Sequence, residues 1–251
     1  MNALLKKVVG EQITDFISKQ LVSRKIKTAI REARKVSTWN PETALDFLSS
    51  KVAREISPWQ YRKEIIGLAA ELQARRPKVI VEVGTAAGGT LFLAASFAAD
   101  DALLISVDLP QGLFGGGYPD WKMPLYKSFA RPGQRIELIR DDSHAPHVLQ
   151  QVKDLLAGRT IDYLFLDGDH SYEGVKEDFE KFLPLVSKDG LVAFHDIAKD
   201  RSPQPDHFVS DFWNEIKQDY EHRELIQDPN QSKCGLGLLF IANPVMATKL
   251  V

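Results

Sequence analysis

Acids and histidines gather at two places in this sequence, each directly after a short apolar run. The stretch Asp167–His170 follows the run Tyr163–Leu166. The pair His195–Asp196 follows a second run, Leu191–Phe194, and a helix-like segment, Tyr172–Val186, lies between the two. In a parallel α/β sheet the carboxyl ends of neighbouring strands meet at one edge, where ligands bind. Carboxylates beside imidazoles at such an edge hold a divalent metal or move a proton, so the pattern predicts an enzyme.

Length and composition limit the classes of protein that this chain can be. A chain of 251 residues can bury the core of one α/β domain with an appendage. Its 34 acidic residues nearly balance its 32 basic residues, so we expect no nucleic-acid partner. Cys234 is the only cysteine, which excludes an internal disulfide and suits a reducing cytosol. We interpret Cys234 as a small packed residue.

The first 35 residues are basic and carry apolar side chains at helical spacing. They lack the unbroken apolar core of a secretory signal, and no run in the chain approaches the roughly 20 apolar residues that cross a bilayer. We therefore expect a cytoplasmic protein. Two interpretations of the basic segment stay open. It is a helical arm that packs on its own domain or on a second subunit of a homo-oligomer, or it is an amphipathic helix that lies on an anionic membrane surface.

Two helix-start signals precede the sheet. A proline after Asn40 predicts a helix that runs to about Arg54. A proline after Ser57 predicts another helix that ends near Arg75. We divide the chain into an N-terminal helical arm over residues 1–56 and one catalytic domain over residues 57–251.

Beyond residue 77 strands and helices alternate, which predicts a mostly parallel sheet with helices on both faces. The predicted strands are Val79–Val83, Ala102–Val107, Arg135–Ile139, Ile161–Leu166, Leu191–Phe194, Glu221–Ile226 and Gly235–Ile241. The predicted helices are Gly89–Ala98, Pro119–Ala130, Ala145–Leu156, Tyr172–Val186 and His207–Tyr220. The link between the last two strands is too short for a crossover, so they should form an antiparallel hairpin. The fold class is therefore α/β, with a Rossmann-like seven-stranded sheet.

A glycine-bearing turn follows the first strand. Gly84 permits a tight turn, and the pair Gly88-Gly89 lets the backbone approach a ligand at the start of a helix. The spacing is neither the Gly-x-Gly-x-x-Gly of dinucleotide binders nor a phosphate loop. Glu82, inside the strand, would repel a phosphate but would attract a cationic ligand.

Polar residues follow the next two strands. Asp108 ends the second strand about 20 residues beyond the glycine turn, where an acid is placed to bind a ribose diol. The stretch Arg140–His144 ends the third strand, where it could contact an adenine edge. A glycine turn, a ribose acid and an adenine contact in this order are characteristic of a nucleoside-binding sheet.

The stretch Val81–Thr90 resembles motif I of the class I S-adenosylmethionine-dependent methyltransferases. Within that class, the runs Leu166–Ile197 and Asp108–Tyr118 resemble the family-24 group, which is allied to cephalosporin-hydroxylase-like and sugar O-methyltransferases. The resemblance covers roughly residues 58–241 and implies that S-adenosylmethionine is the cofactor. The implied cofactor-binding residues are Glu82, Gly84, Thr85, Gly89, Asp108, Asp142 and Ser143.

The same resemblance implies a metal and a general base. Asp167, His195 and Asp196 stand where metal-dependent relatives carry their ligands, although His195 replaces the usual acid. Mg²⁺ or Mn²⁺ is expected, although an imidazole ligand suits Mn²⁺, Fe²⁺ or Zn²⁺ better than Mg²⁺. Asp167 and His170 are the expected catalytic residues, with His170 as the base that takes the acceptor proton. The expected acceptor is a small hydroxylated molecule, a sugar or a phenol. Asp169 either shares this site or caps the following helix.

Two loops are candidate lids. The segment 111–132 carries Phe114, Tyr118, Trp121 and Tyr126 and has a possible hinge at Gly115–Gly117; its aromatic residues either cover an acceptor or pack in the core. The second candidate is Ala198–Asp206. Two rival functions also remain open. One is an S-adenosylmethionine-binding protein without catalysis, and the other is a metal-dependent hydrolase or oxygenase.

Overall fold

The computed structural model of the chain describes residues 3–36, 39–112, 117–202 and 208–244. Seven strands form one sheet in the order β3-β2-β1-β4-β5-β7-β6. Neighbours from β3 to β5 are parallel, whereas β7 runs antiparallel to both β5 and β6. The strands are β1 Val79–Val83, β2 Leu103–Val107, β3 Arg135–Ile139, β4 Ile161–Leu166, β5 Val186–His195, β6 Tyr220–Leu225 and β7 Leu236–Pro244. The predicted mostly parallel sheet with a C-terminal hairpin is confirmed.

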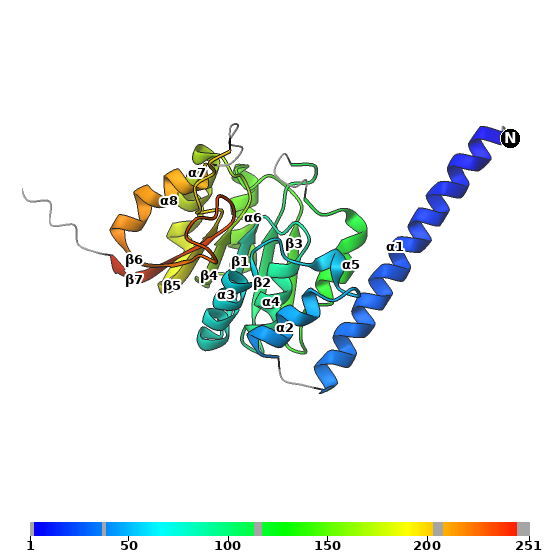
Figure 1. Cartoon of the computed structure of the whole chain (residues 1–251), viewed down its shortest axis with the longest axis horizontal. Helices are drawn as coiled ribbons and strands as arrows, with labels where there is room; N and C mark the ends of the chain where they lie inside the picture. Colours follow the sequence, from blue (N-terminus) through cyan, green and yellow to red (C-terminus); the bar gives the residue numbers. More distant parts are fainter. Residues whose placement is uncertain (1–2, 37–38, 113–116, 203–207, 245–251) are drawn as a thin grey trace, which may run out of the picture.

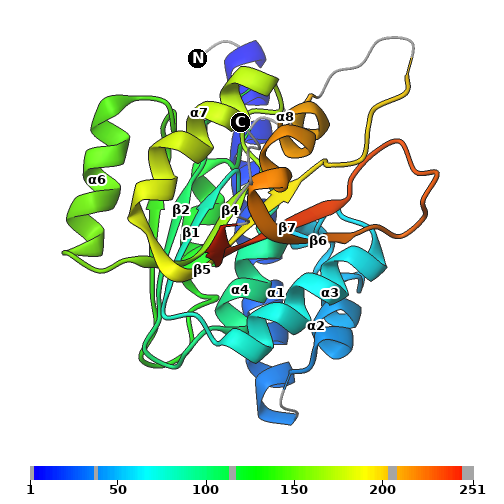
Figure 2. The same cartoon turned by 90° about the vertical axis from the view of Figure 1, so that its left-hand side faces the viewer.

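Helices cover both faces of the sheet (Figure 1). Figure 2 shows α6, α7 and α8 on one side of the strands and α1 to α4 on the other. The helices are α1 Ala3–Val36, α2 Pro41–Leu48, α3 Arg62–Arg75, α4 Gly89–Phe97, α5 Met123–Lys127, α6 Pro146–Leu156, α7 Tyr172–Phe182 and α8 Val209–Ile216. Short 3₁₀ turns occupy Arg54–Ile56, Asp120–Lys122, Leu183–Leu185 and Lys217–Asp219.

Each face of the sheet has its own apolar core because side chains alternate along a strand. On β1, Ile80 packs with the core that contains α2 to α5, whereas Val81 packs with the core that contains α6 to α8. The five residues of β1 and of β2 are all buried, as expected for central strands of a sheet covered on both sides.

The register of the central strands aligns their carboxyl ends. Val83 pairs with Val107 on one side and with Leu166 on the other, and Leu166 pairs with Phe194. The residues that follow these four lie along one edge of the sheet: Asp108, Gly84, Asp167 and His195. The chain moves outward from β1 to β2 and β3 and then returns to β4 on the other side of β1. Ligands bind at such a reversal in open α/β sheets.

Several predicted helix bounds before the sheet and in the loop after β2 are wrong. The helix that starts after Asn40 ends at Leu48 because the following pair Ser49-Ser50 favours a turn. Its N-terminus is capped as predicted, since Asn40 accepts a hydrogen bond from the backbone N–H of Thr43 at 2.8 Å. The next helix starts at Arg62, because residues 57–60 run across the glycine turn. The predicted helix Pro119–Ala130 shortens to a 3₁₀ turn and α5.

Later bounds also differ. Helix α7 ends at Phe182 instead of at Val186, because Pro184 cannot continue the helical hydrogen bonds. Strand β5 therefore starts at Val186, which pairs with Ile161 of β4. Helix α8 starts at Val209, and the predicted start at His207 lies outside the described residues.

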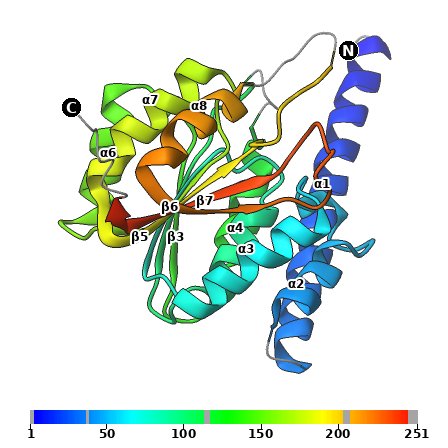
Figure 3. The same ribbon diagram turned by 60° about the vertical axis from the view of Figure 1, so that its left-hand side comes forward.

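The N-terminal segment forms one helix of 34 residues, α1. Ile26 and Ile30 are buried in the core that contains α2 to α5, and α1 contacts α5 and the 3₁₀ turn before it, so this part of the arm packs on its own domain. Phe16, Ile17 and Leu21 are 61%, 51% and 49% exposed, and Figures 1 and 3 show this half of α1 standing away from the sheet. No described helix has both the length and the apolar character of a membrane span. A second subunit or a membrane surface as partner of the arm stays a prediction.

Replacement of Gly84 tests how tightly β1 and β4 approach at their ends. A Cβ at Gly84, whose φ is +85°, would lie 1.9 Å from the backbone oxygen of Asp167. We expect Gly84→Ala to lower the free energy of unfolding by about 3 kcal/mol or more, as measured by urea denaturation.

The matched control is Gly158→Ala. Gly158 has φ of +82° but no atom within 4 Å of the added Cβ, so this change adds only backbone strain. It should cost about 1–2 kcal/mol. Equal losses for the two variants would show that the contact between Gly84 and Asp167 is not the tight one described.

Candidate functional site

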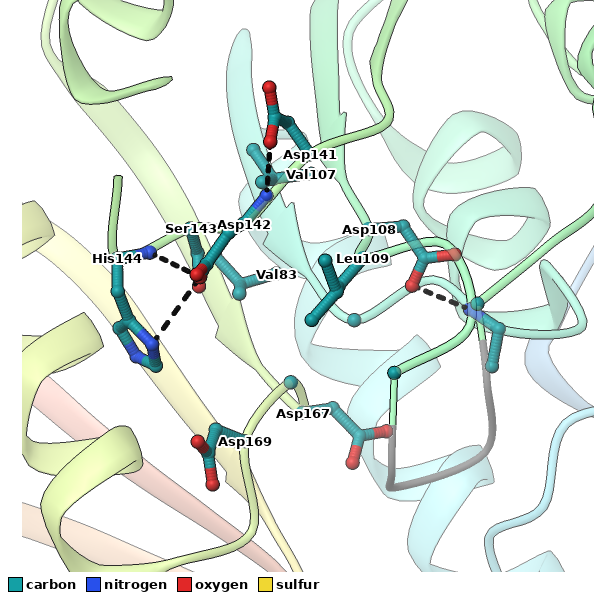
Figure 4. A pocket seen from close by; sticks show the side chains of 15 residues that line it. Val83, Val107, Asp108, Leu109, Asp141, Asp142, Ser143, His144, Asp167 and Asp169 are labelled. Carbon is teal, nitrogen blue, oxygen red and sulfur yellow. Dashed lines mark hydrogen bonds and ion pairs between the residues drawn. The ribbon is translucent and has the colours of Figure 1, made fainter. Parts of the chain in front are cut away.

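The glycine turn lies between two cavities at the carboxyl edge of the sheet. The first cavity has a volume of about 180 Å³, and the ends of β1, β2, β3 and β4 line it. Figure 4 shows Asp108 and Leu109 on one side of it and Asp142, Ser143 and His144 on the other, with Asp167 and Asp169 along a third. The second cavity lies on the other side of the turn, between residues 57–60 and residues 84–90. Gly84, Ala86 and Asp167 line both cavities.

Asp108 fastens two loops to the end of β2. One of its carboxylate oxygens accepts hydrogen bonds from the backbone N–H groups of Thr85 and Ala86, at 3.0 and 3.4 Å. The other accepts from the N–H of Tyr118 at 2.8 Å. Burial raises the pKa of Asp108, although these N–H groups and Arg140 oppose the rise. The predicted ribose acid therefore lines the first cavity and also holds the glycine turn in place.

Thr85 has a structural role that the sequence did not indicate. Its side chain is buried, and its hydroxyl shares a 2.7 Å hydrogen bond with the hydroxyl of Ser106 on β2. Thr85 lines the second cavity and points its hydroxyl into the protein. A ligand at the turn therefore meets the backbone of Thr85 more readily than its hydroxyl.

The predicted adenine contacts lie at the first cavity. Asp142 is half-exposed and accepts a hydrogen bond from the N–H of His144 at 2.9 Å. Ser143 is buried beside it and lines the same cavity. Behind them, burial raises the pKa of Asp178 to about 6, against the attraction of His144. The sequence did not single out Asp178, whose carboxylate supports this wall from α7.

Gly88 and Gly89 lie close to other parts of the protein as well as to the second cavity. A Cβ at Gly88 would meet the ring of Tyr126 at 2.7 Å, and one at Gly89 would meet the backbone N of Pro58 at 2.6 Å. Protein atoms thus occupy the space that the two glycines leave open. Both residues line the second cavity, but their lack of side chains serves packing as much as ligand access.

Glu82 is fully enclosed and lines neither cavity. It accepts a hydrogen bond from the hydroxyl of Thr90, which lines the second cavity. Its other carboxylate oxygen, Oε2, is buried and has no hydrogen-bond partner among the described residues. Burial raises the pKa of Glu82 to about 8. The hydrogen bond from Thr90 lowers this pKa by less than burial raises it, and the negative charges of Asp167 and Asp108 raise it further. A nearby cation would stabilise the ionised form.

The acids and imidazoles predicted to act together do meet in space. His195 Nδ1 lies 2.9 Å from Asp167 Oδ1 and 3.3 Å from Asp196 Oδ2. His170 Nε2 lies 3.4 Å from Asp167 Oδ1, and its Nδ1 lies 3.4 Å from Asp196 Oδ2. Two carboxylates and two imidazoles therefore form one cluster, and Asp167 connects it to both cavities.

The carboxylates favour the charged form of both imidazoles in the absence of a metal. Burial lowers the pKa of His195, but the attraction and hydrogen bonds of Asp167 and Asp196 outweigh it and raise that pKa well above its usual value. Burial likewise lowers the pKa of His170, and the hydrogen bond and charge of Asp167, with Asp196, produce a net increase.

The cluster fits a divalent cation. One ligand atom from each of Asp167, His170 and Asp196 lies within 4.8 Å of the others. His195 Nε2 is buried without a hydrogen-bond partner among the described residues, although its ring lies against two carboxylates. A donor set of oxygen and nitrogen atoms suits Mn²⁺, Fe²⁺ or Zn²⁺ better than Mg²⁺.

Asp169 shapes the turn before α7. Its Oδ1 accepts a hydrogen bond from the N–H of Ser171 at 2.8 Å, while the hydroxyl of Ser171 caps the helix by accepting from Gly174. Asp169 also lines the first cavity. It is therefore a turn residue at the site and does not itself cap α7.

The aromatic residues after β2 divide between the two predicted roles. Tyr118 and Tyr126 are buried in the core, and the hydroxyl of Tyr126 donates to the backbone oxygen of Ala86 at 2.8 Å. They support the glycine turn from beneath and do not form a lid. Phe114, with Gly115 and Gly116 of the predicted hinge, lies outside the described residues, as does part of the second candidate lid, residues 203–206.

Three residues at the site were missed. Gln60 donates from Nε2 to Asp167 Oδ2 at 3.3 Å, across 107 positions of sequence. Trp59, 64% exposed, lines the second cavity beside it. Cys234, interpreted as a packed residue, donates its N–H to Asp196 Oδ1 at 3.0 Å. None of the three carries a sequence signal, because each reaches the site through folding of a distant loop.

Comparison with known proteins supports this architecture. Residues 81–197 match the family described as a methyltransferase domain. The chain resembles the solved structure of an O-methyltransferase from Bacillus cereus in complex with S-adenosylhomocysteine, with a TM-score of 0.56 at 14% identity, over 84% of this chain and 96% of that one. It also resembles TomG, the O-methyltransferase from Streptomyces achromogenes involved in tomaymycin synthesis, in complex with S-adenosylmethionine. That match has a TM-score of 0.52 at 16% identity and covers 88% of this chain and 90% of the other.

Among curated proteins, the chain is similar to "Uncharacterized protein y4gI" of Sinorhizobium fredii (strain NBRC 101917 / NGR234). The two are 29% identical over 172 residues, which cover 67% of this chain. The matched part is 18% of that relative's own length, so the similarity concerns one part of a much longer protein.

The buried Glu82 predicts a pH dependence of stability. Its pKa is about 8 in the folded protein against an ordinary 4.5, so between these values the folded state holds a proton that the unfolded state has lost. The unfolding free energy should therefore fall as pH rises through this range, by of order 1 kcal/mol per pH unit. Glu82→Gln should remove this slope and be more stable than the wild type near pH 8. Urea unfolding across the range measures it, and parallel profiles for the two proteins would contradict it.

Proposed function

We propose that the chain, whose residues 81–197 match the methyltransferase-domain family, is a class I S-adenosylmethionine-dependent methyltransferase that methylates an oxygen atom of a small hydroxylated acceptor. The observation that carries the proposal is the position of Asp167. Asp167 lines both cavities beside the glycine turn, and its carboxylate is part of the cluster of acids and imidazoles. A methyl donor in the cavities and an activated oxygen at the cluster would therefore be neighbours.

The two cavities suit the two ends of the cofactor. The nucleoside would occupy the first cavity, with Asp108 at the ribose and Asp142 and Ser143 around the adenine. The amino-acid end would lie along the backbone of Gly84, Thr85 and Gly89 in the second cavity. Glu82, whose orphan oxygen lies behind Thr90, would attract the cofactor's ammonium group. The sulfonium would then stand near Gly84, where the cavities adjoin.

The cluster would prepare the acceptor. Asp167, His195 and Asp196 would hold a divalent cation, which when bound lowers the pKa of a hydroxyl and fixes its position. His170, 3.4 Å from both Asp167 and Asp196, would take the hydroxyl proton. The acceptor oxygen then forms a bond to the methyl carbon, and the bond from that carbon to sulfur breaks to leave S-adenosylhomocysteine. Gln60 holds the Asp167 carboxylate from the other side.

Exposed apolar side chains around the cluster favour a ring-shaped acceptor. Trp59, whose backbone oxygen lies 3.8 Å from Cys234 Sγ, lines the second cavity beside Asp167. Phe208, 43% exposed, donates its N–H to the backbone oxygen of His170 at 2.7 Å. Aromatic surfaces of this kind pack on a phenol or on the apolar face of a sugar. The solved O-methyltransferases that share the fold agree with oxygen as the accepting atom.

Titration calorimetry with S-adenosylhomocysteine tests cofactor binding. Wild-type protein should bind it, and Asp142→Ala should bind it about tenfold more weakly because a hydrogen-bond acceptor at the adenine is lost. Asp142 contacts only its local turn, so the variant should remain folded.

Asp154→Ala, an exposed change on α6 outside both cavities, is the matched control and should bind like the wild type. No heat from well-folded wild-type protein would refute the proposed function. An unchanged affinity of Asp142→Ala would remove the adenine assignment.

The roles of His170 and Asp167 can be separated by metal titration. If His170 is the base, His170→Ala retains Mn²⁺ affinity but loses methyl transfer to a panel of phenols and sugars. Asp167→Asn should lose both, with metal affinity falling about 10–100-fold. Mn²⁺ binding followed by calorimetry checks the difference. Equal loss of Mn²⁺ affinity in both variants would instead make His170 a ligand.

A further inference from the structure

Cys234 stands at the cluster without a role in the proposed methyl transfer. It is the only cysteine of the chain and lies in the turn that leads into β7. Its backbone N–H donates to Asp196 Oδ1 at 3.0 Å, so the turn is fastened to the end of β5. Both residues have positive φ angles, +62° for Cys234 and +58° for Asp196. This hydrogen bond therefore joins two non-glycine residues that both adopt the left-handed backbone conformation.

The Cys234 thiol lies among groups that bind metals. One ring nitrogen of His195, one carboxylate oxygen of Asp196 and the Cys234 Sγ all lie within 4.8 Å of one another. The thiol is only partly buried, and its Sγ lies 3.8 Å from the backbone oxygen of Trp59. A single ion could be reached by all three side chains after small rotations.

His195 supplies independent support for a bound ion. Its side chain is 7% exposed, and Nδ1 donates to Asp167 Oδ1 at 2.9 Å. Nε2 is buried and has no hydrogen-bond partner among the described residues. A buried nitrogen without a partner is costly, whereas a metal would satisfy its lone pair. Histidine ligands commonly donate their other ring N–H to a carboxylate, as His195 does to Asp167.

We propose that Cys234, His195 and Asp196 bind a thiophilic divalent cation, Zn²⁺, with Asp167 orienting the imidazole from the opposite ring nitrogen. Sulfur, nitrogen and carboxylate oxygen are the donors of protein zinc sites, and three protein ligands leave a fourth position for water or an acceptor oxygen. A thiolate also disfavours Mg²⁺. The inference rests on the metal part of the proposed function. It keeps His195 and Asp196 as ligands, takes Cys234 as the third ligand in place of Asp167, and replaces Mg²⁺ or Mn²⁺ by Zn²⁺.

Binding must release protons, because the thiol binds a metal as the thiolate. The sulfur–hydrogen bond of Cys234 breaks, its electron pair forms the sulfur–metal bond, and the proton passes to solvent. The imidazole of His195 likewise binds through a neutral nitrogen and gives its extra proton to solvent.

Cobalt(II) is a spectroscopic substitute for Zn²⁺ that tests the thiolate directly. We expect titration of the metal-free, full-length protein with Co²⁺ to produce a sulfur-to-cobalt charge-transfer band in the near ultraviolet. Because the chain has one cysteine, any such band in the monomeric complex reports Cys234. Zn²⁺ should abolish the band by displacement, and Mg²⁺ should not. Saturable Co²⁺ binding without this band would overturn the proposal.

Variants assign the ligands. Cys234→Ser should lose the band and weaken Zn²⁺ binding by at least about tenfold. Ser232→Ala, in the same turn, is the matched control and should keep both properties. Asp167→Asn should keep the band but weaken Zn²⁺ binding about 10–100-fold, as expected for an orienting partner. Retention of full Zn²⁺ affinity by folded Cys234→Ser would overturn the assignment.

A measurement on the wild type covers the case in which Cys234→Ser does not fold. The rate at which a disulfide reagent modifies Cys234 should fall about tenfold or more in saturating Zn²⁺, because a metal-bound thiolate is not free to attack. Mg²⁺ should leave the rate unchanged, and equal rates with and without Zn²⁺ would contradict the proposal. The cobalt, zinc and thiol-modification measurements are all made without S-adenosylmethionine. A chain that failed to bind S-adenosylhomocysteine but gave the cobalt band would lose the proposed function and keep the metal site.

Discussion

The close approach of β1 and β4 at their carboxyl ends controls the geometry of the whole site. Asp167 donates its N–H to Val83 at 2.8 Å, and its backbone oxygen lies where a side chain on residue 84 would begin. Only glycine fits there, so the turn after β1 folds directly against Asp167. Through this contact Gly84, which lines both cavities, lies directly against Asp167, the first acid of the cluster. The register of β1 with β2 and of β4 with β5 then brings Asp108 and His195 to the same edge.

Buried charge is the second constraint on this edge. Asp167 and Asp196 lie within hydrogen-bonding range of two imidazoles, and their charge raises the pKa of both histidines against the effect of burial. The cluster is therefore compensated internally while it has no metal. Glu82 has no such partner, and its raised pKa shows the cost of enclosing a carboxylate alone. The acids of the cluster are balanced by imidazoles, whereas Glu82 has no cationic partner among the described residues. An edge of this kind suits a cationic ligand near Glu82 and a metal at the cluster.

Residues on both faces of the sheet support the walls of the site. Tyr126 and Pro58 fill the space beside Gly88 and Gly89, so the glycine turn is held from the face that carries α2 to α5. Asp178 and His144 support the wall formed by Asp142 and Ser143 from the face that carries α7. The walls of the site are therefore supported from both faces of the sheet.

Local sequence determined the strands, the glycine turn and the polar residues at strand ends, because alternation, turn chemistry and strand-to-helix spacing are properties of neighbouring residues. It also predicted that Asp167, His170, His195 and Asp196 would meet, since parallel strands must end at one edge. Helix ends were less predictable, as the start of α3 at Arg62 shows, because the packing of residues 57–60 across the glycine turn decides it. Only the tertiary structure brought Gln60 and Cys234 to the site, since each arrives on a loop whose path depends on packing across more than 35 positions of sequence. The burial of Glu82 follows from its place in β1, a central strand that is covered on both sides.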